Sequence, residues 1–544
     1  MRPVLVPPPD DYLHEDGDDP RAAPASKRGA RRAAPQDVAR VSITLGPDIP
    51  RIVESSIAAL EQASVFQRQG ALVDVVRGAT TDGRGVVRPD GAARVRLLPA
   101  PRLREVLAER VKYTRQRQTE GGVSNVTVPP PRDVVEALMA RGEWAFVRPL
   151  AGIAECPCIR PDGTVLDVPG YDAGTHLLYE PSAEVSVSMV PTEADARSAV
   201  AELLELVADF PFASPAHQSA WLAGLLSLLA RPAIDGPCPL LLIDASERGS
   251  GKTLLADIIG LIVSGRTLPR RTMPEKPEEW KKSLLAIAIA ADPVILIDNV
   301  TRQLRSDALD AVLTGTSYRE RLLGKNEELT LDVRTLFIVT ANNASLSPDL
   351  VRRSVHARLE SNTERPESRS GFAYPDIRSH ILEHRGKYLR AGLTILRAYF
   401  VAGCPDMKLR PMGSFEAWSK VIRNPLVWAG QPDPLETQEA LRETSDPEQE
   451  GLEQLLAAWN VVYGEKGVTV RNLLADLADP ADPRERELLT AISVFCDTEP
   501  GKLPSPKRLG NKLRTLRGRI ARRIRFERDP GRNEDGVTWR TRRI

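Results

Sequence analysis

Hydrophobic and polar positions alternate along this chain in short segments whose period switches between that of a strand and that of a helix. Apolar residues recur at helical spacing over 52–64 and form strand-like runs over 71–76 and 94–98. Pro-Asp-Gly and Pro-Gly turn signals flank a further alternating strand within 160–172, which predicts a hairpin. Together these patterns predict a mixed α/β domain over residues 41–190.

The middle of the chain carries longer apolar runs without alternation. Four of them are bounded by polar loops, at 239–244, 293–298, 334–343 and 355–359. Continuous apolar runs are typical of strands buried on both faces, as in a parallel sheet. Helical patterns surround these runs, at 196–210, 214–230, 254–262 and 277–290. Residues 191–365 are therefore predicted to form an α/β core on a parallel sheet, followed by a mainly helical segment over 366–435.

The last part of the chain follows a different pattern. Acidic residues are frequent over 436–450, which predicts a linker. Beyond it, helical patterns lie near Leu452, Val470 and Arg484, and a further helical stripe consists of Leu509, Leu513, Leu516 and Ile520. Two strand-like segments, 523–528 and 537–542, flank a Pro-Gly turn. This order of helices and hairpin is the outline of a winged helix, so residues 451–544 are predicted to form a winged-helix domain.

The composition is that of a globular protein, but its charge is unevenly distributed. The chain is 42% hydrophobic and 27% charged, with a formal net charge of +1. From Lys502 onward, however, 15 Lys and Arg face 4 Asp and Glu, whereas the preceding 501 residues carry 59 against 69. A basic helix and hairpin suit a phosphate backbone, so we expect contacts with duplex DNA from Arg508, Lys512, Arg519 and Arg523. A solvated basic face is the alternative.

The first 40 residues show almost no apolar periodicity and are rich in Pro, Ala, Arg and Asp, which predicts a disordered tail. They lack the basic-then-apolar order of a signal peptide. The longest apolar run, 284–297, is interrupted by Asp292 and is shorter than a membrane span requires. Five scattered cysteines do not make a disulfide framework. We therefore expect a cytoplasmic protein without a membrane partner.

Residues 246–253, Ser-Glu-Arg-Gly-Ser-Gly-Lys-Thr, stand between a predicted strand and a predicted helix. In a phosphate-binding loop, glycines let backbone N–H groups close around phosphate oxygens, and the helix N-terminus adds its positive dipole end. We expect Lys252 to reach the terminal phosphates of ATP and Thr253 to hold Mg²⁺. The predicted nucleotide contacts are Ser246, Gly249, Ser250, Gly251, Lys252, Thr253 and Leu254. Ser246 replaces the usual first glycine, and a chance Gly-Lys-Thr turn is the alternative.

A P-loop ATPase also needs a carboxylate at the end of a neighbouring buried strand, and Asp298 ends such an apolar run. We expect Asp298 to orient Mg²⁺ together with Thr253. The next position, commonly a glutamate that activates the attacking water, is Asn299, whose amide cannot accept that proton. Glu279 and Glu278, on the predicted helix before this strand, are the candidate bases nearest in sequence. A solvated helix N-terminus is the equal alternative for both.

Two later motifs fit the same site. Asn342, with Asn343 as the alternative, ends another apolar run and can sense the terminal phosphate or orient water. Arg352 and Arg353 follow, where an arginine can complete a neighbouring subunit's site by neutralising charge in the transition state. A surface ion pair is the alternative for either arginine.

In this order within about 110 residues, the loop, Asp298, the Asn-tipped strand and the arginine pair resemble the AAA+ core of superfamily-three-like helicases found in phage and plasmid primase-helicases. Other stretches similar to that group from mobile elements are Asp162-Gly163 with 169–172, 296–300, 340–343 and 413–418. The resemblance runs from about residue 45 to the C-terminus. It implies a ring-forming homo-oligomer, such as a hexamer, that is driven by ATP along single-stranded DNA.

In helicases of that kind, a hairpin lies between the strand that ends in the magnesium-binding carboxylate and the Asn-tipped strand, and it grips the DNA backbone inside the ring. A hairpin is predicted here over 318–333, and the resemblance implies a phosphate contact for Lys325 at its tip. An exposed turn lysine is the alternative. The fold class expected for the whole chain is α/β, with a P-loop AAA+ parallel-sheet core, an N-terminal α/β domain and a C-terminal winged-helix domain.

Two functions remain open at this point. The first is an ATP-dependent DNA helicase or translocase that acts in replication of a phage, plasmid or integrated element. The second is an ATP-gated DNA-binding switch, such as a replication initiator or a defence factor, in which Asn299 makes hydrolysis slow. Residues 41–190 show no carboxylate constellation or zinc module for priming, so a separate primase is an expected partner.

Overall fold

The computed structural model describes residues 40–544, apart from 62, 79, 82–84, 120–121, 322–327, 362–365, 446, 500, 522 and 534–535. The tail expected over 1–40 therefore falls almost wholly outside the described residues, and Lys325 falls outside them too. Of the helices in the described part, none combines the length and the apolar character that crossing a membrane requires.

A mostly parallel sheet organises the middle of the molecule. Its parallel strands are β14 (Leu240–Ala245), β15 (Arg270–Arg271), β16 (Val294–Val300), β19 (Leu336–Asn342) and β20 (Ser354–Leu359). Two short strands from the N-terminal region, β4 (Thr80–Thr81) and β5 (Val87–Arg88), extend one edge. The strand order is β20-β14-β19-β16-β15-β5-β4. The sheet predicted from the four apolar runs is thus present, and β19 lies between β14 and β16.

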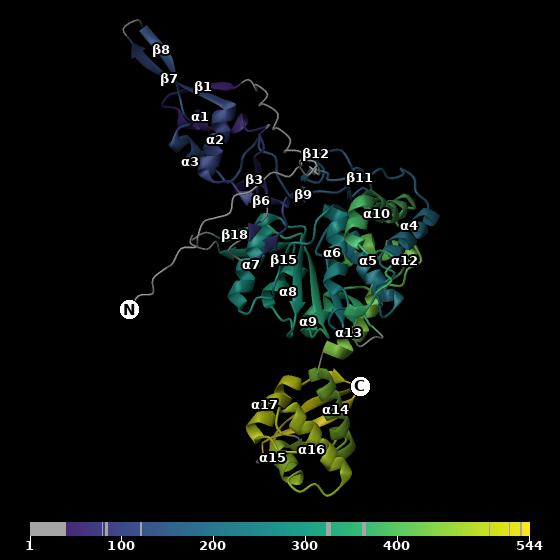
Figure 1. Ribbon diagram of the computed structural model, residues 1–544. Coiled ribbons are helices and arrows are strands. Elements are labelled where there is room, and N and C mark those ends of the chain that lie inside the picture. The colour runs from purple at the N-terminus through teal and green to yellow at the C-terminus, as the bar shows by residue number, and fades with distance from the viewer. Residues whose placement is uncertain are drawn as a thin grey trace, which may run out of the picture.

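Helices cover both faces of this sheet, as Figure 1 shows. One face packs against α5 (Pro215–Leu229), α6 (Lys252–Ser264) and α10 (Ile377–Val401), with α4 (Glu193–Leu206) beside α10; the other packs against α7 (Pro277–Ala290) and α8 (Asp307–Thr314). Leu241 and Ile243 of β14 point to the first group, and Leu242 points to the second. Every residue of β14 is buried, which explains its unbroken apolar sequence.

Small sheets and three helices make up the N-terminal region. Its helices are α1 (Ile49–Ala58), α2 (Ala100–Arg110) and α3 (Arg132–Met139). One sheet has the order β1-β7-β8 and consists of β1 (Val41–Leu45), β7 (Val111–Thr119) and β8 (Gly122–Val128). A second has the order β2-β3-β6 and consists of β2 (Phe66–Arg68), β3 (Ala71–Arg77) and β6 (Ala93–Leu97). The hairpin predicted within 160–172 forms between β10 (Cys158–Ile159) and β11 (Val165–Leu166), and β9 (Gly152–Ala154), β12 (Gly170–Asp172) and β13 (Leu177–Tyr179) form a third sheet.

Buried polar contacts join this region to the core. The Arg88 guanidinium pairs with the Asp292 carboxylate through Nε–Oδ1 and Nη2–Oδ2 distances of 2.9 and 2.5 Å, and both side chains are buried. Arg68 donates from Nη2 to the carbonyls of Ala288 and Asp332 at 3.1 and 3.0 Å. Burial lowers the pKa of Arg68 to about 10. Such contacts fix orientation, because leaving either charge unpaired in the interior is costly.

The segment after the sheet is helical, and it includes the stretch expected as an acidic linker. After α10 come α11 (Glu416–Trp418), a π-helical turn, α12 (Asn424–Trp428), α13 (Thr437–Ser445) and α14 (Pro447–Val462). Helix α13 lies against β20 and the segment around Val351, and its Leu441 is buried in the hydrophobic cluster that α7 and α8 also join. The Gln438 amide donates to the carbonyls of Val351 and Arg352 at 3.0 and 3.1 Å. The linker prediction over 436–450 was wrong for α13. It relied on the many acidic residues and gave no weight to Gln438 and Leu441, which hold the helix on the core.

The C-terminal part has a hydrophobic core of its own. Around that core lie α14, α15 (Val470–Asp476), α16 (Pro483–Phe495), α17 (Pro506–Leu516) and a sheet of order β21-β24-β23-β22, whose strands are β21 (Val468–Thr469), β22 (Ile520–Ala521), β23 (Ile524–Asn533) and β24 (Gly536–Arg543). Leu509, Leu513 and Leu516 are buried as predicted, but Ile520 is exposed in β22. Gly518 takes a left-handed φ of 79° just after the helix ends. Arg519 therefore lies outside the helix on which it was predicted.

Candidate active site

The loop between β14 and α6 is held in a shape that suits phosphate. Gly249 and Gly251 have φ values of 75° and 87°, which glycine adopts without strain. A Cβ on Gly251 would also meet the Phe210 ring at 3.0 Å, so a side chain there would require that ring to move. Gly251 immediately precedes the first helical residue, Lys252. The unpaired N–H groups of the first turn of α6 therefore open onto the loop.

Lys252 links the loop to the end of β19. Its ammonium donates to Asn342 Oδ1 at 2.7 Å and to the Glu247 carbonyl at 3.0 Å. Burial lowers the pKa of Lys252, while Asp244 and Glu247 act in the opposite direction. The structure thus brings Lys252 and Asn342 together as the sequence predicts, with the lysine held by neutral oxygens that phosphate can replace.

Thr253 and Asp298 meet beside this pair. The Thr253 hydroxyl donates to Asp298 Oδ1 at 2.9 Å, and the Thr340 hydroxyl donates to the same oxygen at 2.6 Å. Arg270 Nη1 lies 3.7 Å from Asp298 Oδ2. A hydroxyl and a carboxylate side by side are hard oxygen ligands of the type that Mg²⁺ prefers, so this donor set fits the ion predicted for it.

Asn299 owes its position to a bulge in β16. Between the pairs Ile297–Val339 and Val300–Ala341, β16 has two residues where β19 has one. Asn299, one of these two, takes a left-handed φ of 55°. Its N–H donates to the Thr340 hydroxyl at 2.8 Å, and its side chain is exposed. Asparagine tolerates this backbone conformation better than glutamate does. The left-handed backbone at this position therefore favours asparagine over glutamate.

The candidate bases on α7 lie apart from this cluster. Glu279 is exposed and lines a different hollow, beside Arg94, Arg96 and Lys282. None of its described contacts reaches Asp298, and Glu278 beside it is exposed as well. The structure does not bring either glutamate to the proposed magnesium ligands.

Several polar residues of the site escaped prediction. Asp244, which ends its apolar run as Asp298 does, is buried; its Oδ2 accepts from Arg358 Nη1 at 2.8 Å and its Oδ1 accepts from the Ala344 N–H at 3.1 Å. Asn343, which was predicted only as the alternative to Asn342, donates to the Ser246 carbonyl at 3.3 Å. On the other side, Arg270 donates to the buried Asp257 carboxylate of α6 at 2.8 Å. These contacts hold both flanks of the loop.

The two arginines after β19 differ in accessibility. Arg352 ends α9 (Pro348–Arg352), its side chain is 64% exposed, and it pairs with Asp349 one turn earlier. Arg353 is paired with Asp310 of α8 and is largely buried. Burial raises the pKa of Asp310, against the effect of Arg353. Of the pair, Arg352 is the one with a side chain accessible to another molecule.

The basic residues of the C-terminal part fall into two groups. Arg508 and Lys512 lie on α17 and both face Asp497, at 3.8 and 3.6 Å from its Oδ2. Arg519 precedes β22, and Arg523 is exposed in the turn before β23 with a φ of 61°. The described residues thus place them around the end of α17 and the adjoining hairpin, and they do not make a single helical face.

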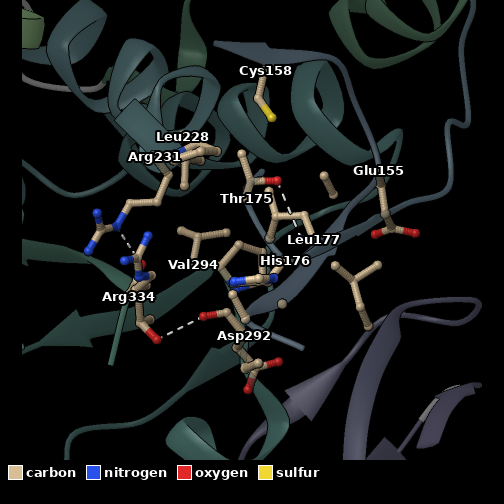
Figure 2. Close-up of a pocket in the computed structure, with 18 of the residues that line it drawn as sticks. Glu155, Cys158, Thr175, His176, Leu177, Leu228, Arg231, Asp292, Val294 and Arg334 are labelled. Atoms are coloured by element: carbon tan, nitrogen blue, oxygen red, sulfur yellow. Dashed lines mark hydrogen bonds between the residues drawn. The ribbon is translucent and has the colours of Figure 1, made fainter. Parts of the chain in front are cut away.

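A separate cavity of about 460 Å³ lies at the opposite, amino-terminal edge of the sheet (Figure 2). Val294, the first residue of β16, lines it together with His176, Leu228 and Arg231. Cys156 also lines it, and burial raises the pKa of this thiol to about 12, so the thiol stays protonated. Lys252 and Asp298 are not among its lining residues. This cavity is therefore not the nucleotide site.

No protein-family model matches this chain, and no curated protein matches it. Among solved structures, the C-terminal region of NrS-1 matches at 11% identity and a TM-score of 0.37, over 87% of this chain and 96% of that one. The SCCmec type IV Cch helicase matches at 12% and 0.32, over 89% and 98%. The JCV helicase matches at 17% and 0.21, over 50% and 73%. Likenesses this weak carry no functional weight, so the site itself must support a function.

Proposed function

We propose that this chain is an ATP-dependent DNA helicase or translocase that acts in replication of a phage, plasmid or integrated element. The observation that supports this most is the convergence of Lys252 with Asn342 and of Thr253 with Asp298 at the carboxyl edge of a parallel sheet. Three separate strand or loop ends supply complementary groups there. A chance Gly-Lys-Thr turn does not require such partners.

The residues present suit ATP with Mg²⁺. The glycine loop and the first turn of α6 would surround the phosphates, Lys252 would reach the terminal ones, and Thr253 with Asp298 would hold the ion. When bound, the ion would neutralise charge on the phosphate oxygens during transfer. Lys252 would then exchange Asn342 for phosphate, which frees the end of β19.

That exchange offers a route from nucleotide to DNA. β19 follows the hairpin of β17 (Ser317–Arg321) and β18 (Glu328–Asp332), which packs against α7. β19 therefore runs from the base of this hairpin at Leu336 to the Lys252 contact at Asn342. Lys325, predicted at the hairpin tip, lies outside the described residues. Arg352 would act in the neighbouring subunit of a homo-oligomer, and Arg508, Lys512, Arg519 and Arg523 would hold duplex DNA.

The test is ATP hydrolysis and strand displacement by Lys252→Ala, with Lys281→Ala as the matched control. Lys281 is an exposed lysine of α7 whose side chain forms no hydrogen bond or ion pair within the described residues. We expect the wild type and Lys281→Ala to hydrolyse ATP faster with DNA and to unwind a forked duplex, and Lys252→Ala to lose at least about a hundredfold in rate. Unwinding by Lys252→Ala at the wild-type rate would contradict the proposal.

Asn299 favours a second candidate function, an ATP-gated DNA-binding switch such as a replication initiator or defence factor. Neither Glu278 nor Glu279 makes a described contact with the magnesium ligands, so a base for hydrolysis has to come from elsewhere. This alternative would be supported by slow ATP turnover together with strong nucleotide-dependent DNA binding. A protein that stays monomeric in ATP and magnesium would support it too. Multiple ATP turnovers coupled to strand displacement rule it out.

A further inference from the structure

The β7–β8 hairpin projects from the N-terminal region beyond the sheet that supports it, as Figure 1 shows. Strand β1 pairs with β7 only from Val111 to Arg115. Beyond that point β7 and β8 pair solely with each other, from Gln116 opposite Asn125 to Thr119 opposite Gly122. In this outer part Gln116, Arg117, Gln118, Ser124 and Asn125 are all exposed.

An isolated two-stranded ribbon gains little stability in water. Its two faces carry only two exposed apolar side chains, Val123 and Val126, among the described residues. Side chains alternate along a strand, so Arg115 and Arg117 continue the face on which Tyr113 is buried in the domain core. On this face Val126 lies opposite Arg115 and Ser124 lies opposite Arg117, so arginine and serine stand at its outer end where a longer domain would continue its apolar core. Its extension therefore fits a polar partner better than a missing piece of core.

The charge of the hairpin identifies the chemistry of that partner. Lys112, Arg115 and Arg117 are exposed, and none of them forms an ion pair in the described part of the chain. Residues 111–128 hold a single acid, Glu120, which stands between the two strands in the sequence. Besides Val123 and Val126, the neighbouring exposed side chains carry amides and hydroxyls, which donate to phosphate or to base edges. An unpaired cationic ribbon of this kind is complementary to a polyanion.

We infer that the β7–β8 hairpin is a second DNA-binding element, which lies in a groove of duplex DNA with Arg115 and Arg117 on the phosphates. The major groove of B-DNA is wide enough to admit a two-stranded ribbon. This inference rests on the proposal that the chain acts on DNA, but it needs neither ATP nor the sheet edge where Lys252 lies. The hairpin would hold duplex while the ATPase core moves.

The experiment measures binding of the full chain to a blunt duplex without nucleotide, as a function of salt concentration. Arg115→Ala/Arg117→Ala is compared with Arg51→Ala/Arg390→Ala, which removes two exposed arginines of α1 and α10 that form no ion pair in the described part of the chain. Each phosphate contact contributes about 0.9 to the slope of log affinity against log salt. The hairpin variant should lower that slope by about 2, and the control should leave it unchanged.

Arg115→Lys/Arg117→Lys keeps both charges and should retain the wild-type slope. A hairpin variant whose slope equals that of the control overturns the inference, and a change in oligomeric state without a change in slope shows a self-association surface in its place. Repeating the measurement in the Lys252→Ala background separates the two proposals. Loss of ATPase activity with an intact salt slope counts against the catalytic role alone.

Discussion

The two edges of the central sheet place different kinds of residue together. At the carboxyl edge, Lys252 meets Asn342, and Asp298 accepts from two hydroxyls. At the amino edge lie the 460 Å³ cavity and the buried Arg88–Asp292 pair. The enclosed space is at one edge and the convergent donors and acceptors are at the other. The proposed function assigns the chemistry to the polar convergence and not to the cavity, because phosphate transfer needs fixed charges and N–H groups.

The largest expected effect comes from matched carboxamide variants, one at each edge. Asp292→Asn leaves the Arg88 guanidinium buried without its counter-charge, so we expect the free energy of unfolding to fall by about 3 kcal/mol. Asp298→Asn keeps an oxygen for the Thr253 and Thr340 hydroxyls but loses charge, so we expect ATP hydrolysis to fall roughly a hundredfold with little change in stability.

Urea unfolding and steady-state ATPase assays check both arms of that comparison. If Asp292→Asn and Asp298→Asn lost the same amount of ATPase activity and were equally stable, the carboxyl edge would not be the catalytic edge and the amino edge would not be the structural one. Nucleotide affinity provides an additional readout, since Asp292→Asn should bind ATP as the wild type does once the folded fraction is taken into account.

A smaller effect should come from pH, through a buried histidine of α5 that faces β20. Burial lowers the pKa of His217 from 6.5 to about 4; the hydrogen bond to the His356 backbone opposes this decrease, and the His356 ring and Arg358 add to it. Its Nδ1 lies 2.7 Å from the His356 carbonyl. The unfolded chain binds this proton near pH 6.5 and the folded one only near pH 4, so the unfolded state takes up more protons in that window.

The free energy of unfolding should therefore fall by roughly 2–3 kcal/mol from this residue as pH decreases from 6.5 to 4. His217→Gln can still donate to the His356 carbonyl but does not titrate, so its stability should depend less steeply on pH. Urea unfolding at several pH values measures the difference. Parallel curves for the variant and the wild type would show that His217 is not the group responsible.

The smallest effect is expected at Asn299. Glycine also adopts a left-handed φ, so Asn299→Gly should change stability by less than about 0.5 kcal/mol and ATP hydrolysis by no more than about twofold. Asn299→Val is the contrasting variant, because a β-branched residue at this φ should cost about 1–2 kcal/mol. A tenfold loss of hydrolysis in Asn299→Gly at unchanged stability would instead assign the amide a part in catalysis.

The local parts of the site could be predicted from the sequence because each depends on neighbouring residues. An apolar run, a glycine loop and a helix pattern predicted β14, the loop and α6, and the runs ending in Asp298 and Asn342 predicted β16 and β19. The strands at 71–76 and 94–98 were correct to within one residue, since alternation and turn signals are local too. Helix α17 was predicted too long, because Gly518 ends it through a backbone angle that the leucine stripe does not report.

The sequence by itself determined which residues can bind phosphate and magnesium, since Lys252, Thr253 and Asp298 have the required chemistry wherever they are placed. Only the tertiary structure decided that β19 lies between β14 and β16, which brings Asn342 to Lys252 and Thr340 to Asp298. It also decided that the N-terminal region extends the sheet through β5 and that α13 packs on the core. Strand order and docking depend on contacts between residues far apart in the chain, and a pattern with a period of two or 3.6 residues contains no information about them.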